Sequence, residues 1–212
     1  MRVTLLLTLS ILLRTTGYSQ APQLQPGDLL FQDSDCGPFC DAIEKVTEGV
    51  DGLDFSHVGM VVMLADTLVV VEAGGNGVVL SPIDTFLQRS LSNDGKPKVV
   101  LGRLKENKWA YKADWQKLLA SYLGLGYDSE FELGDDEYYC SELVEDIMQD
   151  VTGKPFFEVN GMTFKDPDTD DFFPIWVNYF EDLGIPIPEG EPGYNPGMMS
   201  RSEKLEIIYK YY

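Results

Sequence analysis

One cysteine and one histidine stand out as residues that could do chemistry. Cys140 lies in segment 138–144, and His57, the only histidine of the chain, lies in segment 55–60. A thiolate nucleophile needs an imidazole within hydrogen-bonding reach, and the imidazole needs a partner on its other nitrogen to fix its orientation. The pair therefore predicts a cysteine hydrolase in which no second histidine can replace His57.

The pattern around Cys140 suits a nucleophile. Leu143, Val144, Ile147 and Met148 recur at helical spacing, so Cys140 falls at or just before the first turn of an amphipathic helix. Unpaired amide N–H groups and the positive end of the helix dipole favour a thiolate there, and they can also face an oxyanion. The simpler alternative is that the cysteine is a small buried apolar residue.

A predicted β-hairpin brings a carboxylate to His57. β-Branched segments on both sides of residues 64–67 have the pattern of two paired strands. A turn centred on residues 64–65 places Glu72 directly opposite His57, and a turn centred on residues 65–66 makes the two diagonal neighbours on one face. Either register brings carboxylate and imidazole together, whereas a three-residue loop with a bulge would shift the pairing. Taken alone, Glu72 also fits a solvated charge at a strand end.

The rest of the pattern predicts an α+β fold, because the connections between strands are too short for crossover helices and favour an antiparallel sheet. Strands are expected at 29–31, 58–63, 68–71, 78–80 and 98–104. Helices are expected from residue 42 to near Gly49, at 115–123 and from residue 140 onward. After Gly153 we expect long ordered loops over the core, with 205–209 as a candidate final strand.

Composition indicates an exported protein. Residues 1–19 read as a signal peptide, with Arg2, an apolar run too short to span a membrane, and small residues before the expected cut. The remaining residues 20–212 have the length of a single domain. Without Arg2 and Arg14 the chain has 14 basic and 35 acidic residues, a net charge of −21. Such a surface repels phosphate backbones and anionic lipids, so nucleic acid is not expected as a partner.

The other cysteines and an acidic segment offer no metal site. Cys36 and Cys40 could close a disulfide or stay reduced, and zinc would need two further soft or imidazole ligands. Segment 166–170 alternates aspartates like the start of a calcium loop. Asp171 stands where that loop needs glycine, and Val177 stands where it needs glutamate. We therefore expect a solvated acidic loop, no metal and no cofactor.

Five segments in a fixed order resemble a known family. They are Gly27-Asp28-Leu29-Leu30-Phe31-Gln32, Phe55-Ser56-His57-Val58-Gly59, Val71-Glu72-Ala73, Gly126-Tyr127-Asp128 and Tyr139-Cys140-Ser141-Glu142-Leu143. The set is similar to the YiiX/YaeF group of circularly permuted, NlpC-type papain-like cysteine hydrolases, in which histidine precedes cysteine. The resemblance covers a core of about residues 27–150. The Cys36–Cys40 insertion and the extension at about 153–212 match no motif of that family.

The resemblance implies a role for each matched residue. Cys140 would be the nucleophile, His57 the general base and acid, and Glu72 the group that orients His57. Tyr127 would line the site and assist the oxyanion or the substrate carbonyl, although a buried aromatic residue after a helix is the simpler alternative. The implied fold is papain-like, with an antiparallel sheet packed against helices and the nucleophile at a helix N-terminus.

These inferences combine into one expected function and two alternatives. The expected function is a periplasmic or extracellular thiol hydrolase, a cysteine peptidase or amidase that cleaves an amide bond in peptidoglycan-derived peptides through a Cys-His-Glu triad. One alternative is a lipid or N-acyl hydrolase or acyltransferase on the same fold, which the lack of a basic patch disfavours. The other is a non-catalytic module that binds the cell wall, which the complete set of catalytic residue types disfavours. The sequence does not specify an oligomeric state.

Overall fold

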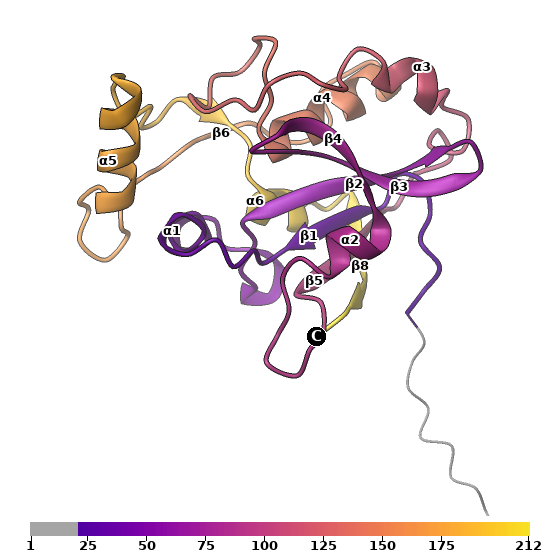
Figure 1. Ribbon diagram of the computed structural model, residues 1–212, viewed down its shortest axis with the longest axis horizontal. Helices are drawn as coiled ribbons and strands as arrows, with labels where there is room; N and C mark the ends of the chain where they lie inside the picture. The colour runs from indigo at the N-terminus through magenta and orange to yellow at the C-terminus, as the bar shows by residue number, and fades with distance from the viewer. Residues whose placement is uncertain (1–20) are drawn as a thin grey trace, which may run out of the picture.

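The centre of the protein is a six-stranded antiparallel sheet with strand order β4-β3-β2-β1-β5-β8 (Figure 1). The computed structural model describes residues 21–212, so the predicted signal peptide at 1–19 lies outside the described residues. The strands of this sheet are β1 (Leu29–Gln32), β2 (His57–Leu64), β3 (Thr67–Gly74), β4 (Gly77–Pro82), β5 (Val99–Leu104) and β8 (Leu205–Lys210). A small second sheet pairs β6 (Asn160–Gly161) with β7 (Pro192–Gly193).

The β2–β3 hairpin adopts the second of the two predicted registers. Leu64 pairs with Thr67, so the turn consists of Ala65 and Asp66, both of which have positive φ, 44° and 65°. Two successive residues with positive φ form the type I′ turn, whose twist matches that of the flanking strands. This register makes His57 and Glu72 diagonal neighbours rather than direct partners.

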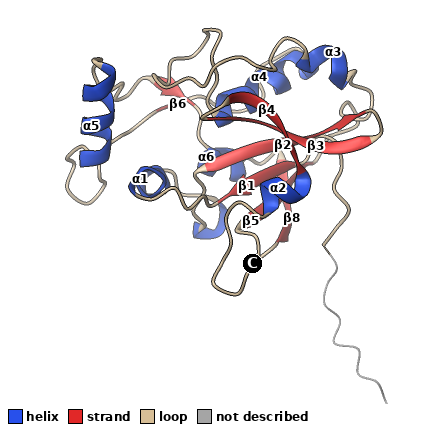
Figure 2. Cartoon of the chain, viewed as in Figure 1, coloured by secondary structure: helices blue, strands red, loops and turns tan. Residues whose placement is uncertain are grey.

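Helices cover both faces of the sheet (Figure 2). They are α1 (Pro38–Val46), α2 (Ile83–Leu87), α3 (Trp115–Leu119), α4 (Cys140–Thr152), α5 (Pro174–Leu183) and α6 (Pro196–Ser200), with a short 3-10 turn at Val50–Gly52. The main core lies between α4 and the sheet, where Phe31, Met60 and Leu143 are fully buried. The strand period of two sends Leu30 to the opposite face, where it packs with Phe86 of α2.

The C-terminal region departs from the prediction of loops. It contributes α5, which lies beside α1 at one end of the molecule (Figure 1), and the short helix α6, in addition to the expected strand β8. Pro174 occupies the first turn of α5, and Gly184 ends the helix in the left-handed conformation at φ 74°. Trp176 and Phe180 of this helix are buried in an aromatic cluster with Phe131.

Two predicted helices have different bounds. The helix expected from residue 42 to near Gly49 begins earlier, at Pro38, because proline is favoured in the first turn of a helix, and it ends earlier, at Val46. The helix expected at 115–123 ends at Leu119, after which the chain continues in turns up to Gly124. In the described part of the chain, no helix is both long enough and apolar enough to cross a bilayer.

Candidate active site

Cys140 is the first residue of α4, as the sequence predicts. Tyr139 precedes it in an extended conformation, and its side chain accepts no hydrogen bond from the first amides of the helix. These amides are therefore not occupied by an N-cap side chain. The thiol is free and buried, with 8% of the residue exposed. The helix packs against β2 and β3, the two strands that carry the histidine and the carboxylate.

His57 and Glu72 meet across the hairpin. Nε2 of the imidazole lies 2.6 Å from Oε2 of the carboxylate, which is the contact expected from the hairpin. The Cys140 side chain lies close enough to the same imidazole to raise its pKa. Because Nε2 is engaged by the carboxylate, Nδ1 is the ring nitrogen left for the sulfur. The structure therefore brings together Cys140, His57 and Glu72, the three residues that the sequence predicts to share a site.

The carboxylate of Glu72 has two further partners that the sequence did not reveal. Arg89 donates from both terminal nitrogens, to Oε2 and to Oε1, each at 2.7 Å. Ser81 donates its hydroxyl to Oε1. Glu72 is 2% exposed, so the bidentate contact with Arg89 compensates a buried charge and fixes the plane of the carboxylate.

Phe86 contacts both His57 and Arg89. Its fully buried ring stacks on the His57 ring at 5.8 Å between centroids and an interplanar angle of 28°. The guanidinium of Arg89 lies over the same phenyl ring, 5.3 Å from the centroid. Phe86 lies in α2 and Arg89 in the turn that follows it. No spacing rule in the sequence relates this segment to His57, because the segment reaches His57 through the pairing of β3 with β4.

The electrostatics favour a charged imidazole. Burial lowers the pKa of His57, but the contacts with Cys140 and Glu72 outweigh this effect and raise the pKa to about 9. Burial acts to raise the pKa of Glu72, but Arg89 and His57 outweigh it and hold this pKa well below its usual range. At neutral pH the pair is therefore an imidazolium next to a carboxylate. The two pKa values belong to one coupled cluster.

Tyr127 lies beside Cys140. It lines the same pocket as Cys140, and burial followed by the nearby Cys140 raises the pKa of its phenol, so the hydroxyl keeps its proton. A protonated phenol is a hydrogen-bond donor. The structure places Tyr127 in the pocket beside Cys140, as the sequence predicts, while its role in stabilising an oxyanion stays a prediction.

The pocket next to Cys140 has a volume of about 140 Å³. Its walls come from α1, from the first turn of α4 and from the C-terminal region, which supplies Met162, Phe164, Trp176, Tyr194 and Met198. His57 is not among the lining residues. The region after Gly153, to which the sequence motifs assigned no role, therefore forms much of the wall beside Cys140.

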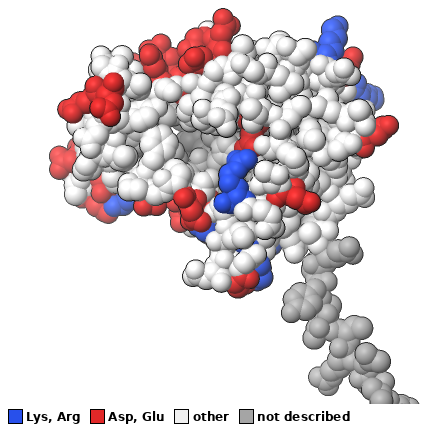
Figure 3. Space-filling model, in the orientation of Figure 1, with Lys and Arg blue, Asp and Glu red and all other residues white. Residues whose placement is uncertain are grey.

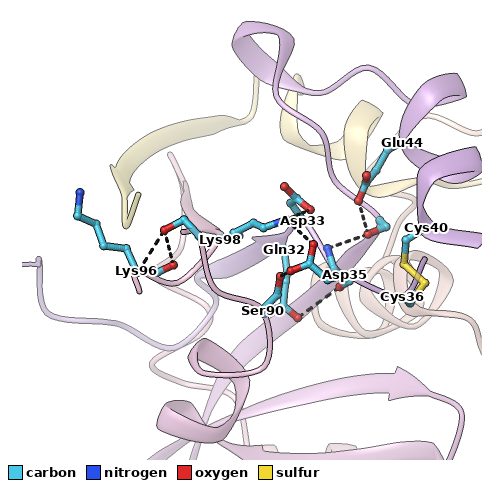
Figure 4. A network of polar contacts seen from close by, with 12 residues as sticks. Gln32, Asp33, Asp35, Cys36, Cys40, Glu44, Ser90, Lys96 and Lys98 are labelled. Atoms are coloured by element: carbon cyan, nitrogen blue, oxygen red, sulfur yellow. Dashed lines mark hydrogen bonds and ion pairs between the residues drawn. A yellow bond between two sulfur atoms is a disulfide. The ribbon is translucent and has the colours of Figure 1, made fainter. Parts of the chain in front are cut away.

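A polar network fixes the loop that leads into α1 (Figure 4). Lys98 pairs with Asp33 at 2.9 Å and with Asp35 at 2.6 Å, and Ser90 donates to Asp35 at 2.9 Å. The cysteines whose pairing the sequence left open form a disulfide, Cys36–Cys40, across the start of the helix. This network holds one wall of the pocket in place.

The acidic segment at 166–170 is tied to α1. Asp166 and Asp168 pair with Lys45 at 2.9 and 2.8 Å. Among residues 21–212, no group of three or more histidine, cysteine, aspartate or glutamate side chains is placed to hold a metal ion.

An antiparallel sheet that carries the histidine and carboxylate, packed on a helix that begins at a cysteine, defines a papain-like thiol hydrolase whose histidine comes first along the chain. Comparison with known proteins agrees. The chain belongs to the family of permuted papain-like amidase enzymes, YaeF/YiiX, C92, whose profile matches residues 23–209. This confirms the family and the α+β papain-like fold expected from the sequence motifs.

Two relatives illustrate the similarity. The uncharacterized protein YiiX of Escherichia coli (strain K12) is 33% identical over 153 residues, which are 70% of this chain and 68% of that protein. The crystal structure of a protein described as metalloprotein yiiX, from Escherichia coli O157:H7, superposes with a TM-score of 0.68 at 28% identity. The match covers 88% of this chain and 97% of that one.

Proposed function

We propose that this protein is a thiol amidase in which Cys140 is the nucleophile, His57 the general acid and base, and Glu72 the group that orients His57. The observation that carries the proposal is the hydrogen bond between His57 Nε2 and Glu72 Oε2 at 2.6 Å, with Cys140 close enough to the same imidazole to raise its pKa. Membership of an amidase family gives the reaction class. The buried carboxylate and the stacked Phe86 hold the imidazole in one orientation.

The reaction would proceed in two halves. The Cys140 sulfur forms a bond to the carbonyl carbon of the amide, and the carbonyl electrons move to oxygen. His57 then gives its proton to the amide nitrogen as the C–N bond breaks, leaving a thioester. In the second half His57 takes a proton from water, whose oxygen attacks the thioester, and the thiolate leaves to regenerate the enzyme.

The oxyanion would be stabilised at the start of α4. The backbone N–H of Cys140 and the protonated phenol of Tyr127 are the proposed donors, because both belong to the pocket where the carbonyl must lie. A donor of this kind typically contributes about 10²- to 10³-fold in kcat. Tyr127→Phe tests this, since it keeps the ring and removes only the donor.

For the substrate we propose an amide bond in peptidoglycan-derived peptides, reached after export to the periplasm or the outside of the cell. The predicted signal peptide supports export. A second candidate is an N-acyl hydrolase or acyltransferase. It is favoured by the pocket beside Cys140, since none of the residues described as lining it is Asp, Glu, Lys, Arg or His.

The test is a digest of purified peptidoglycan, of N-acyl amides and of ester lipids by the protein without its first 19 residues, with products identified by mass. Cys140→Ala, which removes only the sulfur, is the matched control. Amide products from muropeptides alone support the cell-wall substrate, and products from acyl amides alone support the second candidate. Binding to peptidoglycan without turnover of any substrate would instead indicate a binding module. N-terminal sequencing of the protein recovered outside the cytoplasm tests export.

A further inference from the structure

The pocket beside Cys140 is lined without charged side chains, which is unusual in so acidic a chain. The chain has 35 acidic and 16 basic residues, yet none of them is among the residues that line this pocket. Its wall combines aliphatic, thioether and aromatic side chains with a smaller number of uncharged polar side chains. The apolar part includes Ile43, Val46 and Met162, and the polar part includes Ser56 and Asn195. Figure 3 shows a hollow in this face with mostly uncharged walls and with a basic and an acidic side chain at its right-hand rim, while other acidic side chains gather over the outer parts of the molecule. A charged group would lose its hydration there with no compensating partner.

The position of the pocket relates it to one side of the scissile bond. His57 must deliver a proton to the leaving nitrogen, so the amine side of the substrate lies next to the imidazole. Cys140 lines the pocket and His57 does not. A group seated in the pocket is therefore attached to the carbonyl that Cys140 attacks, on the acyl side of the bond.

The size of the pocket limits its occupant. An apolar cavity of about 150 Å³ in another protein binds benzene, so a pocket of about 140 Å³ accommodates about six carbon atoms. The rest of a longer acyl chain would extend out of the pocket into solvent. The walls are also fixed, because the aromatic cluster holds Trp176 and Phe164 in edge-to-face contact at 5.1 Å.

We propose that this pocket selects the substrate by binding an uncharged aliphatic group of about four to six carbons, bonded directly to the scissile carbonyl. The group is either a short acyl chain or the side chain of an apolar amino acid. This inference rests on the proposed function for the identity of the reacting carbonyl. It assigns substrate selection to α1 and to the C-terminal region at 153–212.

The experiment uses alkyl chloromethyl ketones, R–CO–CH₂Cl, because their reaction needs only the thiolate and no amide hydrolysis. The Cys140 sulfur forms a bond to the CH₂ carbon, the C–Cl bond breaks and chloride leaves. With Cys36 and Cys40 joined in a disulfide, Cys140 is the free thiol of the chain, so mass spectrometry of the intact protein counts a single adduct. The second-order rate constant is measured for R from methyl to octyl.

The expected rate rises about fourfold for each added methylene up to about five or six carbons and then levels off or falls. Met162→Ala enlarges the pocket and should move the maximum to chains longer by about two carbons. Met162→Glu should reduce the ratio of the pentyl to the methyl rate at least tenfold. Met63→Ala, a half-buried methionine on β2 that does not line the pocket, is the matched control and should leave this ratio unchanged.

The ratio of two rates within one variant cancels differences in thiolate population and in folded fraction. A rate that does not depend on R in the wild type, or the same optimum in Met162→Ala, would overturn the proposal. Length dependence without hydrolysis of any amide would instead refute the amidase function and leave the pocket's preference in place. Comparing the hexanoyl with the N-acetylnorleucyl chloromethyl ketone distinguishes an acyl chain from an amino-acid side chain.

Discussion

Replacing Glu72 and replacing Arg89 should have different effects on the pKa of His57. Glu72→Gln keeps a hydrogen-bonding side chain next to Nε2 but removes the negative charge 2.6 Å away, while Arg89 keeps its positive charge. Arg89→Gln leaves the carboxylate in place and removes the competing cation. The pKa of His57 should therefore fall in Glu72→Gln and stay at or above its wild-type value in Arg89→Gln.

The magnitude follows from the distance and the burial. An opposite charge at this range shifts a pKa by about one to three. The pKa of His57 should therefore fall from about 9 to about 6–8 in Glu72→Gln. Since one pKa unit corresponds to 1.36 kcal/mol, the imidazolium loses about 1.4 to 4 kcal/mol of stabilisation. Turnover near neutral pH should slow, because less of the enzyme carries the proton that the leaving nitrogen needs.

The same shift predicts how stability depends on pH. The folded-state pKa of His57 is raised above 6.5, so its contribution is fully present below pH 6.5 and is lost as pH rises through about 9. A rise from 6.5 to about 9 corresponds to about 3 kcal/mol of unfolding free energy. In Glu72→Gln this contribution becomes smaller and is lost at lower pH.

The assay is direct because the chain has one histidine. Its ring Cε1–H resonance is followed by NMR from pH 5 to 10 in the wild type and both variants, and urea unfolding at pH 6 and 9.5 measures stability. Thermal unfolding at pH 7 establishes that each variant is folded. A His57 pKa in Glu72→Gln within about 0.5 of the wild-type value would refute the reasoning, as would a fall of similar size in both variants.

Three further predictions concern His57, the disulfide and the contact of α6 with Thr47, the residue that follows α1. His57→Ala should lower kcat by about 10²- to 10⁴-fold with the fold intact by circular dichroism, and activity within tenfold of wild type would contradict the general-base assignment. Replacing Cys36 and Cys40 by serine should lower the unfolding free energy by about 2 kcal/mol, since the closed loop is short, and a larger loss in urea titration would mean that the bridge does more than restrict the unfolded chain. Gly197→Ala should cost about 1 to 3 kcal/mol, because a Cβ there would overlap the Thr47 carbonyl oxygen, and an unchanged urea midpoint would mean that α6 can shift.

The sequence predicted the site where short-range rules apply. The hairpin brought Glu72 to His57 because a two-residue turn leaves few registers, and helical spacing placed Cys140 at a helix start. Arg89 and Ser81 were missed because their contact with Glu72 depends on how β4 and the segment after it fold onto β3. The helix α5 was missed because aromatic and proline-rich composition hid its start and end signals, Pro174 and Gly184. Tertiary packing, rather than local preference, determined these parts.

The order of elements along the chain also has a consequence for how the protein folds. His57, Glu72 and Arg89 lie on one meander of neighbouring strands and the helix after it, so their contacts close loops of fewer than 35 residues. Cys140 comes more than 80 residues after His57, on a helix that must dock as a separate unit. Loop-closure entropy favours the local contacts first. We therefore expect the contact between imidazole and carboxylate to form before the helix that begins at Cys140 docks, so that the thiol is the last of the three groups to be covered.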